Sequence, residues 1–162
     1  MQAVMNEISQ RLGQEVELYR RLLEVVSEER DILLEGGHQR LMGTTERKLA
    51  VCKELAMVQE DRRELMQRLS PDRDNPLKLS DLAGRLPEKQ QGAFRSLINK
   101  LRSVSARLAE LNELNKNFIE DALDTVEGLL QAMTGGGGGA AYGNKGNCKN
   151  GPSLPRLVTR EV

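Results

Sequence analysis

A seam rich in apolar residues recurs every three or four positions along the second half of the chain. This seam begins at Phe94 and keeps its spacing to Ala132, shortly before five consecutive glycines. Its members are Phe94, Leu97, Leu101, Val104, Leu108, Leu111, Asn115, Phe118, Ala122, Thr125, Leu129 and Ala132. A mean step of about 3.5 residues is typical of a helix that packs against another helix along its length. The pattern therefore predicts one long helix and at least one partner helix.

Two further helices are predicted before the long one. Apolar residues at helical spacing indicate a first helix over about residues 2–35, and the paired glycines at 36–37 end it because glycine readily adopts left-handed dihedrals. A second helix is expected over about residues 39–69. Gln59 and Arg62 interrupt its apolar stripe, which predicts a wet or polar-paired stretch there.

Two prolines break the chain between residues 70 and 86, because proline lacks the amide proton that a helix interior needs. A short helical turn is expected over residues 79–85. Pro87 suits the first position of a helix, so the long helix should run from there to about Met133. The predicted fold class is all-α, an antiparallel three-helix, coiled-coil-like bundle with a long third helix.

The chain divides into two parts by composition. Residues 1–134 are expected to form the helical bundle. Residues 135–162 are expected to form a disordered, flexible glycine-rich tail, since such a composition cannot bury enough surface to order itself. Four basic residues and one acidic residue give this tail a mildly basic charge of +3.

The long helix is longer than the second helix, which is its predicted antiparallel partner. At 1.5 Å per residue the two span roughly 70 Å and roughly 46 Å, so their pairing should end near residue 118. Asn115 is a polar residue within the seam and needs a hydrogen-bond partner. That register places it beside Thr44 or Thr45, either of which offers one. Uncovered apolar side chains usually mark an interaction site. The predicted docking surface consists of Ala122, Leu123, Val126, Leu129, Leu130 and Met133.

Composition argues against nucleic-acid binding and against catalysis. The 24 basic and 24 acidic residues cancel, which removes the electrostatic footprint of a nucleic-acid binder. His38 is the only histidine, so the Glu35-x-x-His38 spacing cannot be repeated on a facing helix, as a di-metal bundle site requires. No nucleophile, base and acid set and no phosphate-cradling glycine loop can be assembled. We expect no enzymatic activity, no metal and no cofactor.

The thiols and the hydropathy of the chain bear on its compartment. Cys52 and Cys148 form no CxxC motif, which fits a reducing compartment. The first residues lack the basic and apolar regions of a secretory signal, and no stretch of about 20 apolar residues occurs. A cytoplasmic protein without stable membrane insertion is expected.

Four short motifs follow one another along the chain. They are Glu28-Glu29-Arg30 near the end of the first helix, Arg62-Arg63-Glu64-Leu65-Met66 in the second, Asn112-Glu113-Leu114-Asn115-Lys116-Asn117-Phe118-Ile119 in the third, and Tyr142-Gly143-Asn144-Lys145-Gly146 in the tail. In this order they resemble the FlgN family of flagellar type III export chaperones, over nearly the whole chain. The run of glycines at 135–139 departs from the family pattern.

The resemblance implies a cytoplasmic, non-enzymatic chaperone for hook-filament junction proteins, which are also called hook-associated proteins. Such a chaperone binds their C-terminal segments, prevents premature assembly and delivers them to the flagellar type III export apparatus. In the family, the amphipathic end of the last helix is associated with substrate binding, which matches residues 122–133 here. A tail tyrosine is associated with docking on the cytoplasmic part of the export gate, which matches Tyr142.

Two other interpretations of the residues stay open at this point. A structural coiled-coil protein would use the seam only for self-association into a homo-oligomer, and mixing with junction proteins would then yield no heterocomplex. A peripheral membrane module would use the basic tail. This is the weaker alternative, because separated basic residues without an apolar face bind lipid poorly.

Overall fold

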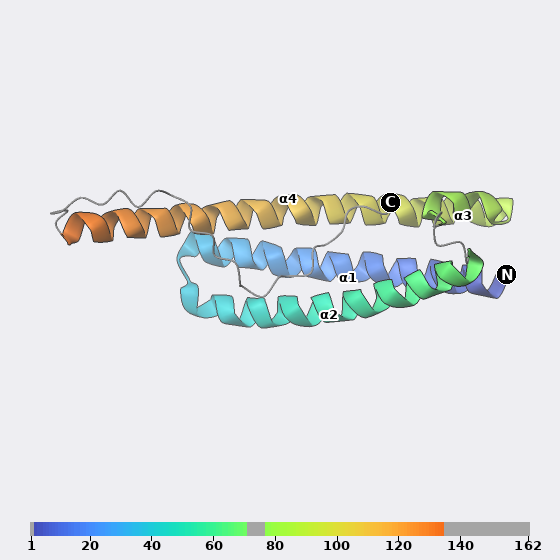
Figure 1. The fold of residues 1–162 in the computed structure, drawn as a ribbon, viewed down its shortest axis with the longest axis horizontal. Helices are drawn as coiled ribbons and strands as arrows, with labels where there is room; N and C mark the ends of the chain where they lie inside the picture. Colours follow the sequence, from blue (N-terminus) through green and yellow to red (C-terminus); the bar gives the residue numbers. More distant parts are fainter. Residues whose placement is uncertain (1, 71–76, 135–162) are drawn as a thin grey trace.

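The computed structural model describes residues 2–70 and 77–134, which form four helices (Figure 1). The elements are α1 (Gln2–Glu35), α2 (His38–Leu69), α3 (Leu79–Arg85) and α4 (Glu88–Met133). Each bound lies within one residue of the bound expected from sequence, and the all-α prediction with a long last helix is confirmed. The predicted tail, which includes Tyr142, lies outside the described residues.

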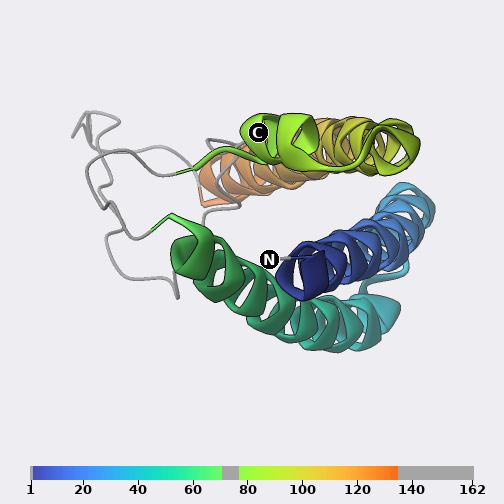
Figure 2. The ribbon, with the colours of Figure 1, turned by 90° about the vertical axis from the view of Figure 1, so that its right-hand side faces the viewer.

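The three long helices alternate in direction, and α1 has α2 and α4 on different sides of it (Figures 1 and 2). The α2 helix runs back antiparallel along α1 after the turn that joins them. The α4 helix begins at the end of the bundle where α1 begins and continues past the α1–α2 turn. No Cα atom of α2 lies within 8 Å of a Cα atom of α4. Both helices therefore pack mainly against α1.

The predicted pairing of the long helix with α2 is wrong, and α1 is its partner. The side-chain amide of Asn115 donates to the backbone carbonyl of Val26 and to Glu29 Oε2, both on α1 and both at 3.1 Å. The hydroxyls of Thr44 and Thr45 instead donate to a carbonyl of their own helix. The physical reason is that α1 is apolar over an arc wide enough for two neighbours, whereas polar residues interrupt the stripe of α2.

Two glycines make the turn between α1 and α2. Gly36 has a φ of 74°, a left-handed conformation that favours glycine. The amide of Gly37 donates to the carbonyl of Ile32 at 3.0 Å, which satisfies one of the free carbonyls at the end of α1. The turn is short, so α2 begins within three residues of the end of α1.

The core is a thin aliphatic strip along α1. Ile8, Leu12, Leu22 and Val26 are almost completely buried there, and Phe94 is the largest fully buried side chain. The short α3 helix packs against the start of α4 and adds apolar side chains to the same core. The two ends of the bundle therefore differ, because α3 packs at one end and α4 projects beyond the other (Figure 1).

Candidate functional site

The seam of α4 is covered by the bundle as far as Phe118 and uncovered beyond it. Phe94, Leu108 and Asn115 are buried, Phe118 is half-buried, and every residue from 119 to 134 is exposed. Figure 1 shows this last part of α4 in orange, extending past the α1–α2 turn. The expectation that the helix loses its cover near residue 118 is confirmed.

The uncovered part of α4 has one continuous apolar side. Its exposed fraction is 41% at Ile119, 52% at Val126 and 83% at Met133. Residues three or four apart lie on the same side of a helix, so these side chains form one stripe. We call this stripe the overhang face; it consists of Ile119, Ala122, Leu123, Val126, Leu129, Leu130 and Met133. It contains all six predicted docking residues.

Ile119 belongs to the overhang face although the predicted docking surface left it out. Its spacing of seven residues from Val126, and of fourteen from Met133, was the available signal. Seven residues are close to two helical turns, so the three side chains lie on one line. The face therefore begins directly after the half-buried Phe118.

Two threonine side chains near the end of α4 donate hydrogen bonds to carbonyls of the same helix. The hydroxyl of Thr125 donates to the carbonyl of Asp121 at 2.9 Å. At the last turn, the backbone amide and the hydroxyl of Thr134 both donate to the carbonyl of Leu130, at 2.9 and 2.8 Å. The two bonds from Thr134 satisfy one of the carbonyls that a helix end leaves free.

A polar junction ties the three long helices together just before the overhang face. Glu29 Oε2 on α1 accepts a hydrogen bond from Asn115 on α4 at 3.1 Å and from Lys48 on α2 at 2.9 Å. Asn115 also donates to the carbonyl of Val26. The Oδ1 atom of Asn115 accepts no hydrogen bond from a described residue. Asn115 and Glu29 thus fix the register at which α4 leaves α1.

Arg30 adds a second link at the same level. Its guanidinium donates to the backbone carbonyl of Leu114 at 3.2 Å and lies 5.4 Å from the centre of the Phe118 ring. This is the geometry of a cation–π contact. The base of the overhang face is therefore held to α1 by both a polar and an aromatic contact.

Replacing Asn115 by aspartate should destabilise the bundle by about 3 kcal/mol at neutral pH. The change keeps the shape of the side chain but removes both donated hydrogen bonds and places a second carboxylate beside Glu29. Burial and the neighbouring charge raise the pKa of the new carboxyl in the folded state. The loss of stability that comes from the new charge therefore appears as the pH rises through that pKa and disappears on acidification.

Urea unfolding followed by circular dichroism at neutral and at acidic pH measures this effect. Asn112→Asp, three residues earlier at a half-buried position, is the matched control and should change stability much less. Equal stabilities of the two variants would show that the junction does not hold α4 on α1.

A second buried polar contact joins α1 to α2 farther along the bundle. Glu15 is 1% exposed, and its carboxylate accepts a hydrogen bond from Arg62. Nearby, the amide of Gln59 donates to the hydroxyl of Tyr19 at 3.3 Å. The predicted wet or polar-paired stretch at Gln59 and Arg62 is therefore polar-paired. Burial raises the pKa of the Glu15 carboxyl, and Arg62 partly offsets that rise.

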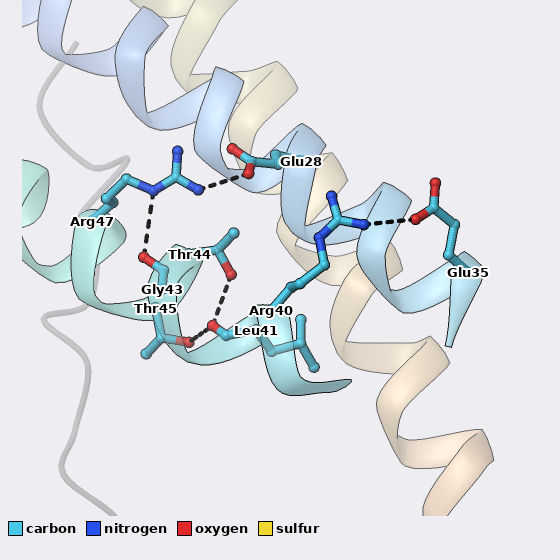
Figure 3. A network of polar contacts seen from close by, with 8 residues as sticks. All are labelled: Glu28, Glu35, Arg40, Leu41, Gly43, Thr44, Thr45 and Arg47. Atoms are coloured by element: carbon cyan, nitrogen blue, oxygen red, sulfur yellow. Dashed lines mark hydrogen bonds and ion pairs between the residues drawn. The ribbon is translucent and has the colours of Figure 1, made fainter. Parts of the chain in front are cut away.

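Exposed ion pairs surround the α1–α2 turn, and Figure 3 shows two of them. Arg47 Nη2 lies 2.7 Å from Glu28 Oε1, and Arg40 Nη1 lies 2.9 Å from Glu35 Oε2. The hydrogen bond from Arg47 lowers the pKa of the Glu28 carboxyl. Exposed pairs of this kind contribute little to stability.

Residues 2–70 and 77–134 contain neither a metal-binding cluster nor a membrane-spanning helix. No three His, Cys, Asp or Glu side chains gather there in a way that could hold a metal ion. No helix in that part of the chain combines the length and the apolar character that crossing a bilayer requires. The overhang face is thus the feature of the described residues that best fits a binding site.

Comparison with known proteins supplies a family for this arrangement. The model of the family described as FlgN protein matches residues 1–150. The match takes in all four helices and the whole overhang face. No curated protein and no solved structure matches the chain.

Proposed function

Because the chain belongs to the FlgN family of flagellar export chaperones for hook-associated proteins, we propose that its overhang face binds the C-terminal segment of such a protein. FlgN chaperones are non-enzymatic and cytoplasmic, and the chain is therefore a cytoplasmic chaperone and not an enzyme. Its partners include hook-associated proteins.

Seven apolar side chains on one side of α4 are exposed, and this exposure is the main support for binding at the overhang face. Monomeric proteins rarely leave such a continuous stripe in water without a partner for it. Apolar residues at spacings of three, four and seven are the anchors by which two amphipathic helices bind one another. Covering the matching apolar side of the cargo would also keep it from assembling before export.

Binding to a hook-associated protein with and without its C-terminal segment tests this proposal. Isothermal titration with the intact cargo should give a defined complex, and deletion of that segment should weaken binding by at least about a hundredfold, a loss of about 2.7 kcal/mol. A deleted cargo that binds as tightly as the intact one would contradict the proposal.

We further propose that Tyr142 docks this chaperone on the cytoplasmic part of the export gate. Tyr142 lies outside the described residues, so the support comes from sequence and from the family resemblance. It is the only aromatic residue after Phe118, and a tyrosine offers a large contact area with few torsions to order. Glycine-rich sequences couple the parts that they join only weakly. Delivery should thus be separable from cargo binding.

The variant Tyr142→Ala should keep cargo binding within about twofold of wild type, because the substitution lies outside that interface. Export of the cargo and binding to the isolated gate domain should both fall sharply. Tyr142→Phe is the matched control and should retain most of both activities, since it keeps the aromatic ring. Wild-type export by the alanine variant, or equal losses of cargo and gate binding, would refute the separation.

A further inference from the structure

The charged residues within the part of α4 that bears the overhang face are all acidic. Between residues 117 and 134 the chain has four acidic residues and no lysine or arginine. The acidic residues are Glu120, Asp121, Asp124 and Glu127. Lys116 is the last basic residue before the face. This end of α4 therefore has a local charge of −4.

The four carboxylates are unevenly placed around the helix. At about 100° per residue, Glu120 and Glu127 fall on one line, directly beside Leu123 and Leu130. Asp121 and Asp124 fall on the side away from the apolar stripe. Only one edge of the face is thus lined by carboxylates, which repeat after two helical turns.

The two glutamates at this edge are free to meet a partner. Glu120 Oε1 lies 3.9 Å from Lys116 Nζ, in an exposed pair that contributes little. No described residue forms an ion pair with Glu127. In helix pairs, charged residues that flank the apolar seam at this spacing determine which partner is accepted.

We infer that the overhang face selects a basic amphipathic helix, with lysine or arginine residues two turns apart beside its apolar stripe. The inference rests on the proposed function and specifies the kind of segment that binds there. Residues 119–133 form a face about 21 Å long at 1.5 Å per residue, which about four turns of a partner helix would cover. Each basic residue would lie opposite Glu120 or Glu127.

The same charges disfavour a second copy of this chain as the occupant. Two overhang faces packed together would bring together the edges that contain Glu120 and Glu127, and residues 117–134 include no lysine or arginine to offset these charges. Like charges across an interface oppose association. A neutral or acidic helix gains nothing from the glutamate edge.

Two synthetic amphipathic peptides of 15 residues test the inference. They share one apolar stripe and differ only at two flanking positions two turns apart, which are lysine in one peptide and glutamate in the other. Fluorescence anisotropy with the full chain at low ionic strength should show about tenfold tighter binding of the lysine peptide, as two exposed charge pairs allow. Salt should reduce that preference.

Charge reversal on the chaperone supplies the matched control. Glu120→Lys with Glu127→Lys should abolish or reverse the preference. Asp121→Lys with Asp124→Lys makes the same change of net charge on the far side and should largely retain it. Equal affinities of the wild-type chain for both peptides, or equal losses in the two double variants, would overturn the inference. A wild-type dimer that buries the face, seen by light scattering and cross-linking, would overturn it as well.

The peptide result can be separated from the proposed function by titrating a hook-associated protein in parallel. If that protein binds the wild type through its C-terminal segment while the peptides bind equally, the charge preference is wrong and the proposed function stands. If neither the protein nor any peptide binds at the overhang face, both fail.

Discussion

Glutamate at both Val126 and Leu130 will abolish binding of the hook-associated cargo and leave the helical bundle folded. The two side chains are 52% and 56% exposed, so they contribute little to the core of the free chaperone. Completing their burial against cargo contributes about 1 kcal/mol each, and burying a carboxylate in their place adds a larger penalty. We expect binding to weaken by at least about a hundredfold.

A matched control adds the same two charges to the other side of the same turns. Gly128→Glu with Gln131→Glu suits this purpose, because a side chain at Gly128 would enter open space and Gln131 is exposed. The control should bind cargo nearly as wild type does, and circular dichroism should show both variants folded. Unfolding of the Val126 and Leu130 variant would place these residues in a core instead of a docking surface.

Removing Arg62 alone will destabilise the chaperone by about 3–5 kcal/mol, because Arg62→Met leaves the buried carboxylate of Glu15 without its charged partner. Removing both partners, as Glu15→Leu with Arg62→Met, should restore stability to about the wild-type level or above. Apolar side chains of similar volume avoid the desolvation penalty of a buried ion pair. Urea unfolding of the single and double variants measures the difference.

The pH dependence of these variants checks the same cause. Burial raises the pKa of Glu15 in the folded protein, so between the unfolded and the folded pKa the folded state binds more protons. Its contribution to stability is full below the unfolded pKa and is lost as the pH rises through the folded pKa. Without Arg62 the folded pKa rises further. The defect of Arg62→Met should therefore be largest at neutral pH and shrink on acidification, and a pH-independent defect would contradict this account.

The helix bounds could be predicted because their signals are local. Gly36 and Gly37 end α1, and the prolines after Ser70 end α2, without any help from distant residues. The point at which α4 loses its cover was predicted correctly, although the partner was not. The reason is that α1 ends and α2 begins at the same turn, so pairing with either helix would leave α4 uncovered from the same level onward.

The partner of α4 depends on how widely each helix is apolar around its axis, which a single stripe does not reveal. Glu15 and Glu29 illustrate the problem, because both occupy positions of the apolar stripe of α1, between Leu12 and Tyr19 and between Val26 and Leu33. Their charge suggests exposure, yet each lies against a basic residue of α2. Sequence indicated polar pairing at Arg62 but could not identify a partner that lies 47 residues away along the chain.

Amide hydrogen exchange, measured by mass spectrometry on the free chaperone and on its complex with a hook-associated protein, shows whether the cargo binds along the overhang face. Residues 119–133 should exchange fast in the free protein and become strongly protected in the complex, with little change over residues 94–115. Protection confined to α1 and α2, with residues 119–133 still exchanging fast in the complex, would contradict binding along that face.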